Sequence, residues 1–508
     1  MPVSSIFRLV RASWVLAREG VFTQVDSRHM PVQARMLLTF AKWIATRKQK
    51  LDRRGHISKA MEKLGPSYIK LGQFLATRPD IVGVQAANEL GELQDKLSPF
   101  PTAQAIKIVE ADIGLPINQI FLEFSGPVAA ASIAQVHKAR IDGNEGEKYV
   151  AVKILRPGVE RRFRRDVEDM LRVARIAEKF SLEAQRLRLI EVVETLARSV
   201  KLEMDFRIEA AAASEFEENT RSDLSFRVPK VDWDRTSKNV LVIEWIDGTS
   251  LSDIEGLKKK GFDLPSIGKN VIQSFLRHAM RDGFFHADMH QGNLFIDEEG
   301  KLTAVDFGIT GRLGKKERRF LAEILYGFIT RNYKRVAEVH FEAGYVAKTY
   351  SVDDFAQAIR AIGEPIHSRT ADQISMARLL ALLFEVTALF EMKTRTELVL
   401  LQKTMVVVEG VARSLDPHLN LWSAAEPVVN EWIAENIGPK AVITDFRDST
   451  QHLLRALPKV TELIERASES RELKSSEKRQ PAFFPLSLHL ALWVAVLLLA
   501  INIGVLLK

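Results

Sequence analysis

Two aspartates and an asparagine at fixed spacing most constrain what this chain can fold into. Asn293 follows Asp288 by five positions, and Asp306 follows Asn293 by thirteen. Their side-chain oxygens are hard ligands of the kind that hold divalent cations against the phosphates of a nucleotide. A further carboxylate can accept a proton or orient the attacking group. The spacing therefore predicts Asn293 and Asp306 as Mg²⁺ ligands and Asp288 as a catalytic residue.

The same intervals occur in protein kinases, and other kinase-like parts lie upstream in the expected order. The apolar run 150–152 ends in Lys153, which is predicted to lie on a buried strand and hold the phosphates of ATP. An Ala-rich segment precedes it where a kinase carries a Gly-rich loop, and no G-x-G spacing occurs in the sequence. Ala avoids positive φ, so this loop should cover the nucleotide differently from a Gly loop. The predicted nucleotide-contacting residues here are Ala129, Ala130, Ala131, Ser132, Ile133, Ala134, Gln135 and Val136.

Two further motifs are K-x-G-Q at 70–73 and E-x-D at 203–205. With them the chain resembles the UbiB family, also called the ADCK family, of atypical kinase-like proteins. The resemblance runs from about residue 60 to 330, and more weakly to about 440. It implies an ATP-binding fold tied to ubiquinone (coenzyme Q) biosynthesis at a membrane. It also implies that Glu209 pairs with Lys153, although Glu203 is within reach by sequence.

Lys70 and Gln73 are the unusual element, and Lys70 is assigned to the catalytic residues. Residues three apart share one helix face, so both side chains can point into the site from an added N-terminal segment. Lys70 is expected to pair with Glu203 or Asp205. Such a segment would cover the groove that a protein substrate needs, and no A-P-E motif follows Asp306. We therefore expect ATP hydrolysis or action on a small lipid-like substrate, without phosphorylation of proteins in trans.

The run 240–246 is apolar apart from Glu244 and predicts either a hinge strand whose backbone meets adenine or a plain buried strand. If the run is a hinge strand, Glu244 and Ile246 are expected to contact the nucleotide. His286 and His290 flank Asp288, and we expect loop histidines that form hydrogen bonds rather than metal ligands.

The amino-acid composition limits the classes of binding partner that we expect. The 508 residues carry 72 Lys and Arg against 65 Asp and Glu, and the net charge of +7 suits nucleic acid or an anionic membrane equally. No zinc-ligand spacing or interleaved aromatic–basic motif supports nucleic acid, so none is expected as a partner. Cysteine is absent, which excludes disulfides and thiol nucleophiles.

The C-terminal segment 485–507 has no formal charge and is rich in Leu, Ala and Val. As a helix it would span about 35 Å at ~1.5 Å per residue, enough to cross a bilayer. Basic residues precede it, which predicts a single pass in a bacterial inner membrane with the catalytic body in the cytoplasm. A buried core helix is the alternative. The run 36–44 predicts an interfacial amphipathic helix or a helix packed on the core.

The predicted fold class is α+β: a two-lobed protein-kinase-like fold with an added helical K-x-G-Q segment and a C-terminal transmembrane helix. Strands are expected at 120–124, 134–137 and 149–154, and 189–200 carries one apolar helix face. The predicted parts are a basic N-terminal helical region at 1–60, the K-x-G-Q extension at 61–118, the N-lobe at 119–248, the C-lobe at 249–440, a juxtamembrane linker at 441–482 and the anchor at 483–508.

The leading functional hypothesis is a membrane-anchored ATPase or phosphotransferase that uses ATP and Mg²⁺ and supports ubiquinone biosynthesis. Its expected partners are anionic phospholipid, polyprenyl quinone precursors and enzymes of the pathway, and the resemblance is compatible with a homodimer. Three alternatives stay open: a conventional protein or small-molecule kinase, a polyprenylphenol hydroxylase, and a non-catalytic nucleotide-dependent scaffold. The hydroxylase would need a flavin or metal–oxygen site, and the sequence has no G-x-G-x-x-G.

Overall fold

A computed structural model describes residues 3–24, 32–45, 56–76, 78–91, 93, 97–143, 146–367, 386, 389–392 and 396–437. Its contacts separate two compact units, Met1–Ile433 and Ala434–Lys508, and the elements below belong to the first or begin in it. The predicted linker at 441–482 and anchor at 483–508, with the span 485–507, lie outside the described residues. Of the helices that the structure describes, none is both long and apolar enough to cross a membrane.

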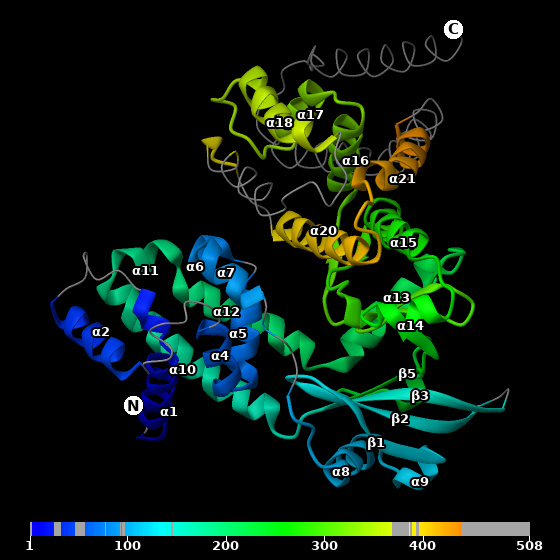
Figure 1. Cartoon of the computed structure of the whole chain (residues 1–508). Helices are drawn as coiled ribbons and strands as arrows, with labels where there is room; N and C mark the ends of the chain where they lie inside the picture. Colours follow the sequence, from blue (N-terminus) through cyan, green and yellow to red (C-terminus); the bar gives the residue numbers. More distant parts are fainter. Residues whose placement is uncertain are drawn as a thin grey trace, which may run out of the picture. The chain divides into compact units, whose positions relative to one another are not determined.

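The N-terminal sheet is antiparallel, with strand order β1-β2-β3-β5. Its strands are β1 (Glu123–Ala130), β2 (Ala134–Gly143), β3 (Gly146–Leu155) and β5 (Val240–Glu244). Buried and less buried residues alternate along β2, because successive side chains of a strand point to opposite faces. One face packs on α8 (Thr102–Ile113) and α9 (Ile117–Ile120), which Figure 1 shows below the sheet.

The structure corrects the strand predicted at 120–124. Ile120 ends helix α9, and β1 begins only at Glu123. The apolar residues Ile120 and Phe121, at the end of this helix, are buried in the hydrophobic cluster on this face of the sheet. An apolar run of this length does not distinguish a strand from a short buried helix.

Helices cover the other face of this sheet. They are α10 (Val159–Phe180), α12 (Leu189–Glu203) and α13 (Phe206–Thr220), while the short α11 (Leu182–Leu187) packs on α10. The predicted apolar face of α12 is confirmed, since Val193, Leu196 and Val200 are buried in a cluster that also holds Leu155 and Leu241 of the sheet. Asp205 separates α12 from α13 and caps the latter, its carboxylate accepting from the Arg207 amide.

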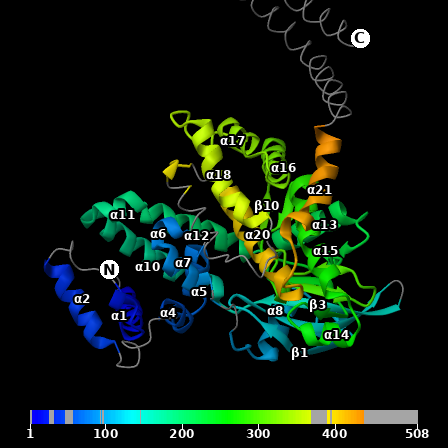
Figure 2. The same ribbon diagram turned by 45° about the horizontal axis from the view of Figure 1, so that its top comes forward.

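The N-terminal helices are α1 (Val3–Arg18), α2 (Val32–Ile44), α4 (His56–Leu64), α5 (Pro66–Ala76), α6 (Pro79–Val82) and α7 (Val84–Gly91), with a 3₁₀ turn η1 (Val21–Gln24). They adjoin α10 and α12 in Figure 2. Buried Asp169 of α10 holds α1 through Ser5 and Arg8, at 2.5 and 2.6 Å. Gly72 of α5 lets this helix approach closely, because a Cβ there would lie 2.4 Å from Leu93 and 3.1 Å from Leu90.

The C-terminal lobe is mainly helical. Its helices are α14 (Ile254–Lys259), α15 (Leu264–Arg277), α16 (Lys315–Ile329), α17 (Tyr333–Glu342), α18 (Val352–His367), α20 (Thr396–Leu415) and α21 (Leu421–Asn436), with the short π-helix η3 (His278–Asp282) and the 3₁₀ turn η4 (Gln291–Asn293). The 3₁₀ turn η2 (Trp233–Arg235) lies against β5 of the N-terminal sheet. Its short strands are β4 (Phe226–Arg227), β6 (Gly248–Ser250), β7 (Phe284–His286), β8 (Leu294–Asp297), β9 (Leu302–Ala304) and β10 (Thr310–Arg312), in orders β4-β9-β8-β6 and β10-β7. One hydrophobic cluster joins α15, α20 and α21 to these strands.

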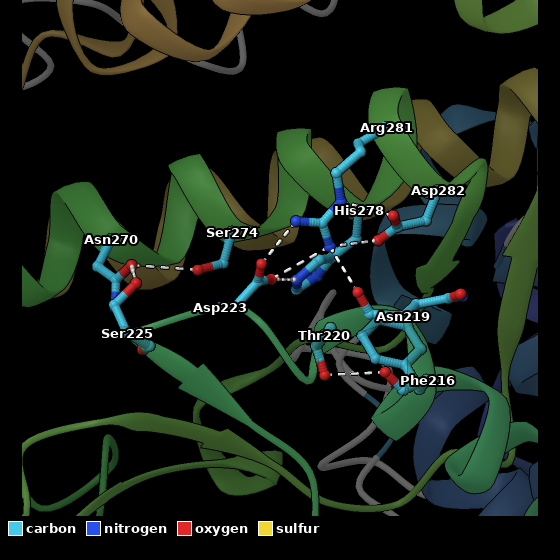
Figure 3. A network of polar contacts seen from close by, with 10 residues as sticks. All are labelled: Phe216, Asn219, Thr220, Asp223, Ser225, Asn270, Ser274, His278, Arg281 and Asp282. Carbon is cyan, nitrogen blue, oxygen red and sulfur yellow. Dashed lines mark hydrogen bonds and ion pairs between the residues drawn. The ribbon is translucent and has the colours of Figure 1, made fainter.

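A buried polar network supports the segment that leads into β7 (Figure 3). Asp223 contacts Arg281 at 2.5 Å and His278 at 3.2 Å, and Arg281 also donates to the carbonyl of Asn219. Burial alone would raise the pKa of Asp223, but His278 and Arg281 lower it to about 2. Burial also lowers the pKa of His278, whose ring packs against Phe216. The network thus joins the end of α13 to the π-helix just before the predicted catalytic loop.

Acidification is expected to destabilise the protein through its buried histidines. Burial lowers the pKa values of His278, His286 and His340, so these rings resist protonation in the folded chain. Unfolded histidine takes up a proton near pH ~6.5, so the unfolded state binds more protons below that pH and the free energy of unfolding falls, by at most about 1.4 kcal/mol per pH unit for each ring. Thermal unfolding between about pH 7.5 and pH 5.5 measures this slope.

The variant His278→Gln should show a flatter pH dependence than the wild type. Its matched control is His418→Gln, since His418 is exposed. An unchanged slope in His278→Gln would mean that this ring is protonated in the folded state.

Candidate active site

Three side chains from separate parts of the chain meet at the predicted phosphate anchor. The Lys153 ammonium lies 2.8 and 3.0 Å from the two carboxylate oxygens of Glu209, and 3.0 Å from Oδ1 of Asp306. Alternation along β3 buries Val152 and Ile154 on the α8 side and leaves Lys153 facing α13. Glu209 lies in the first turn of α13. The predicted pairing of Lys153 with Glu209 is therefore present.

The charges of this cluster are strongly coupled. Burial opposes ionisation of Lys153, but the carboxylates of Asp306 and Glu209 outweigh it and raise the pKa of the ammonium. Burial alone would likewise raise the pKa of Asp306, but Lys153 reverses this and holds it well below its usual range. Burial raises the pKa of Glu209 to about 7, against the pull of Lys153. The charge state of each of these three groups therefore depends on the charges of the other two.

Asp306 has a left-handed backbone, with φ of +65°. This region is unfavourable for a residue with a Cβ, and such strain is common at functional sites. The following Phe307 is buried against Phe216 and His286, and the Gly308 amide donates to Asp306 Oδ1 at 3.3 Å. The packing of Phe307 and this hydrogen bond together fix the Asp306 carboxylate near Lys153.

The loop after β7 is organised by His286. The Asp288 amide donates to His286 Nδ1 at 3.0 Å, so the proton lies on Nε2, which donates to the carbonyl of Val305 at 3.1 Å. Both ring nitrogens are therefore occupied, as expected for a structural loop histidine rather than a metal ligand. The Asp288 side chain is 41% exposed, and His290 Nε2 lies 3.8 Å from it. Asp288 thus presents its carboxylate to solvent from a fixed backbone.

Asn293 and Asp306 are brought together by the backbone. The Val305 amide donates to the carbonyl of Asn293 at 2.9 Å, and the Asn293 side chain donates to the carbonyl of Asp288 at 3.1 Å. The described residues contain no group of three or more His, Cys, Asp or Glu that could hold a metal by itself. Two protein oxygens nevertheless fit Mg²⁺, which keeps several waters and takes phosphate oxygens as further ligands.

Lys70 reaches this region from α5. Its ammonium lies 2.8 Å from Glu203 Oε2, and both side chains are mostly buried, with 10% and 18% exposed. The structure selects Glu203 from the two predicted partners, because Asp205 is paired with Arg207. The charge of Lys70 also contributes to lowering the pKa of Asp306. Gln73 lies one turn further along α5 and is half-buried.

Comparison with known proteins places the chain in a family. A model of the ABC1 atypical kinase-like domain matches residues 92–340, and a model of the UbiB helical domain matches residues 359–420. A Marinobacter nauticus protein named "Probable protein kinase UbiB" is 38% identical over 90% of this chain and 84% of its own length. Proteins of that name from Pseudomonas aeruginosa and Aeromonas hydrophila are both 37% identical, over 84% and 90% of this chain and 81% and 84% of their own lengths. The chain belongs to the UbiB family.

A solved structure agrees with the fold. The complex of Rv3197 with erythromycin from Mycobacterium tuberculosis matches 78% of this chain and 97% of its own, with a TM-score of 0.52 and 23% identity. At this identity the match concerns the fold alone. The predicted resemblance to the UbiB family and the α+β atypical kinase-like fold are confirmed.

The Ala-rich loop of this UbiB-family chain is largely enclosed by the protein. Ala129 and Ala130 end β1, and a tight turn follows in which the Ala131 amide donates to the carbonyl of Ala134 at 2.8 Å. The next four residues are buried: Ser132, Ile133, Ala134 and Gln135. The Gln135 amide is bonded to both the amide and the carbonyl of Phe100. Its side chain is thus engaged inside the protein, and a nucleotide contact of Gln135 stays a prediction.

Val136 and the hinge residues are placed differently. Val136 is the cross-strand partner of Lys153, so its side chain lies on the nucleotide-facing side of the sheet. The Glu244 side chain instead contacts Arg227, and its amide donates to the carbonyl of Lys230. Ile246 follows the strand and is partly buried. A nucleotide contact in the hinge remains a prediction and would not use the Glu244 carboxylate in this arrangement.

Sequence reasoning missed the contribution of α20. Buried Thr404 of this helix donates to the carbonyl of Ala287, at 3.1 Å, directly before Asp288. Thr404 is preceded by Lys403, whose charge interacts with Asp288. The available signal was the polar stretch Gln402-Lys403-Thr404 between the apolar runs 398–401 and 405–408, and no fixed interval ties it to the catalytic loop.

Replacing Glu209 by Gln is expected to weaken binding of Mg²⁺–ADP about 10-fold, because Lys153 loses a charged hydrogen-bond partner that positions it. Titration calorimetry on the purified chain measures the dissociation constant. Glu218→Gln is the matched control, since Glu218 is exposed on the same helix. Equal affinity in Glu209→Gln and the control would show that the pair does not position Lys153 for nucleotide.

Proposed function

We propose that this chain binds ATP with Mg²⁺ and transfers or hydrolyses its terminal phosphoryl group. The observation that carries the proposal is the contact of Lys153 with both Glu209 and Asp306, at 2.8 and 3.0 Å. Phosphoryl transfer needs positioning and charge neutralisation more than covalent help from the protein. The side chains required for both lie on β3, α13 and the two segments after β7.

Each residue has a defined role in this proposal. Lys153 holds the α- and β-phosphates, while Asn293 and Asp306 hold Mg²⁺, which when bound neutralises phosphate charge. Asp288 orients the acceptor hydroxyl or water and takes its proton. As the new O–P bond forms, the bond to the β–γ bridging oxygen breaks and ADP leaves with the electron pair. A role in ubiquinone biosynthesis is proposed from what membership of the UbiB family implies.

The position of α5 favours a small acceptor over a protein. Lys70 lies in a mostly buried ion pair with Glu203, and Leu71 and Phe74 pack against the cluster that contains Ile133 of the Ala-rich loop. An added helix at this place restricts the approach of an extended polypeptide. We therefore infer that water or a lipid-like molecule, such as a polyprenyl quinone precursor, is the acceptor. Trans phosphorylation of proteins is not expected.

We also propose attachment to a membrane by two routes. One is the C-terminal span predicted at 485–507. The other is the exposed face of α1 and α2, which pack against each other. This face carries large apolar side chains, 46–75% exposed, beside the exposed bases Arg11 and Arg35: Ile6, Phe7, Val10, Trp14, Met36, Phe40 and Trp43. Apolar side chains mixed with bases suit an anionic bilayer surface. Enzymes of ubiquinone biosynthesis and a second copy of the chain are further proposed partners.

Nucleotide turnover tests the proposed activity. The full chain in detergent or anionic liposomes should hydrolyse ATP with Mg²⁺, and Asp306→Asn should lower turnover at least ~100-fold, because charge stabilisation at the phosphates is lost. Asp142→Asn is the control, as Asp142 is exposed near the end of β2. Mg²⁺-dependent binding without turnover in the wild type would favour a scaffold, and absence of nucleotide binding would overturn the proposal.

The lipid surface has its own test. Phe7→Ser with Trp14→Ser should remove most of the stimulation of turnover by anionic liposomes and leave the rate in detergent unchanged, because both side chains lie outside the site. Leu224→Ser is the control, since Leu224 is a 90% exposed apolar residue near β4. Full stimulation in the double variant would exclude α1 as a lipid-binding element.

A further inference from the structure

The catalytic loop has no strong cation of its own. Between His286 and Asn293 the sequence contains neither Lys nor Arg. The lysines already placed at the site have carboxylate partners: Lys153 contacts Glu209 and Asp306, and Lys70 contacts Glu203. The terminal phosphoryl group would lie between Lys153 and Asp288, where charge develops during transfer. A cation directed at Asp288 must therefore come from outside this loop.

Helix α20 is fixed directly behind the loop. Thr404 Oγ1 shares its proton between the carbonyl of Leu400, at 2.8 Å, and that of Ala287, at 3.1 Å in a buried contact. The Gln291 side chain donates to Ser414 at 2.5 Å. The helix also packs closely on α15, where a Cβ at Gly268 would lie 3.0 Å from the carbonyl of Ala412. Contacts at two loop positions, one on each side of Asp288, hold α20 in register with the loop.

The position of α20 against the catalytic loop also determines where Lys403 lies. It directly precedes Thr404, and its side chain is exposed to solvent. Partial desolvation by the surrounding protein lowers the pKa of its ammonium, with Asp288 opposing the shift and Lys70 adding to it. Among the residues that the structure describes, no carboxylate lies within 4.0 Å of this ammonium. Lys403 is thus a solvent-accessible cation whose neighbour Thr404 contacts the loop directly before Asp288.

We propose that Lys403 binds the terminal phosphoryl group of the nucleotide beside Asp288, so that the helical domain supplies a cation to the kinase-like site. This inference rests on the proposed function, since it requires that the site binds ATP. A cation placed in cis can neutralise the equatorial oxygens of the transferring group, as an arginine finger does. Lys403 lies within the segment matched by the UbiB helical domain, outside the kinase-like match. The site is therefore assembled from two domains.

Discrimination between di- and triphosphate tests the inference without requiring turnover. Calorimetry on the full chain measures binding of Mg²⁺–ADP and of the Mg²⁺ complex of the analogue with NH at the β–γ bridge. Lys403→Met should weaken the analogue about 10-fold and ADP by less than about twofold, because only the analogue carries the contacted group. Lys403→Arg should retain the preference for the analogue. Lys269→Met, an exposed Lys on α15, is the charge-matched control.

Turnover gives a second readout. If the wild type hydrolyses ATP, Lys403→Met should lower kcat about 100-fold with little change in KM, as expected for a group that stabilises the transition state. Suppose that Lys403→Met folds like the wild type but weakens binding of both nucleotides equally, or of neither. That result would overturn the role of Lys403 and leave the proposed function intact. A wild type that binds neither nucleotide would overturn the proposed function and this inference together.

Discussion

The contact of Lys153 with Glu209 and Asp306 is the interaction on which the rest of the site depends. It joins a strand of the N-terminal sheet, the first turn of α13 and the segment after β9. A different local feature positions each of these three side chains. Strand alternation directs Lys153, the helix cap at Asp205 places Glu209 in the first turn of α13, and a left-handed backbone orients Asp306. The mostly buried Lys153 and Glu209 are favourable as a charged pair only when both are in place, and the contact with Asp306 extends this pair to the second lobe.

Around this contact, elements outside the usual kinase lobes supply further charge and cover. On one side α5 holds Lys70 against Glu203, and on another α20 is bonded to the loop at Ala287. Both helices are fixed by packing contacts that do not involve nucleotide. The catalytic loop and the Ala-rich loop are thus held from outside, which agrees with a site built for a small acceptor.

Several features follow directly from the sequence and others do not. The intervals among Asp288, Asn293 and Asp306 are local, since a short loop and two short strands connect them, so spacing alone predicts their proximity. Which of Glu203 and Glu209 pairs with Lys153 depends on a helix break at Asp205. The periodicity of the apolar side chains does not reveal this break.

Long-range placement is harder to predict. The burial of Gln135 depends on the returning segment at Phe100, thirty-five positions earlier. The contact of Thr404 with the carbonyl of Ala287 depends on packing of α20 on α15, and no interval in the sequence encodes that contact. The strand expected at 120–124 begins later for a similar reason, because Ile120 and Phe121 fill the core from a helix end.

Gly72 shows how a residue without a functional group can set the chemistry. Its missing side chain lets α5 rest on Leu90 and Leu93, and the same helix carries Lys70 toward Glu203. Any added carbon would have to displace these leucines or lift the helix, and a lift moves the ammonium with it. The glycine of the K-x-G-Q motif therefore determines how closely α5 packs on its neighbours. Through this packing it also determines how far Lys70, two positions earlier, reaches toward Glu203.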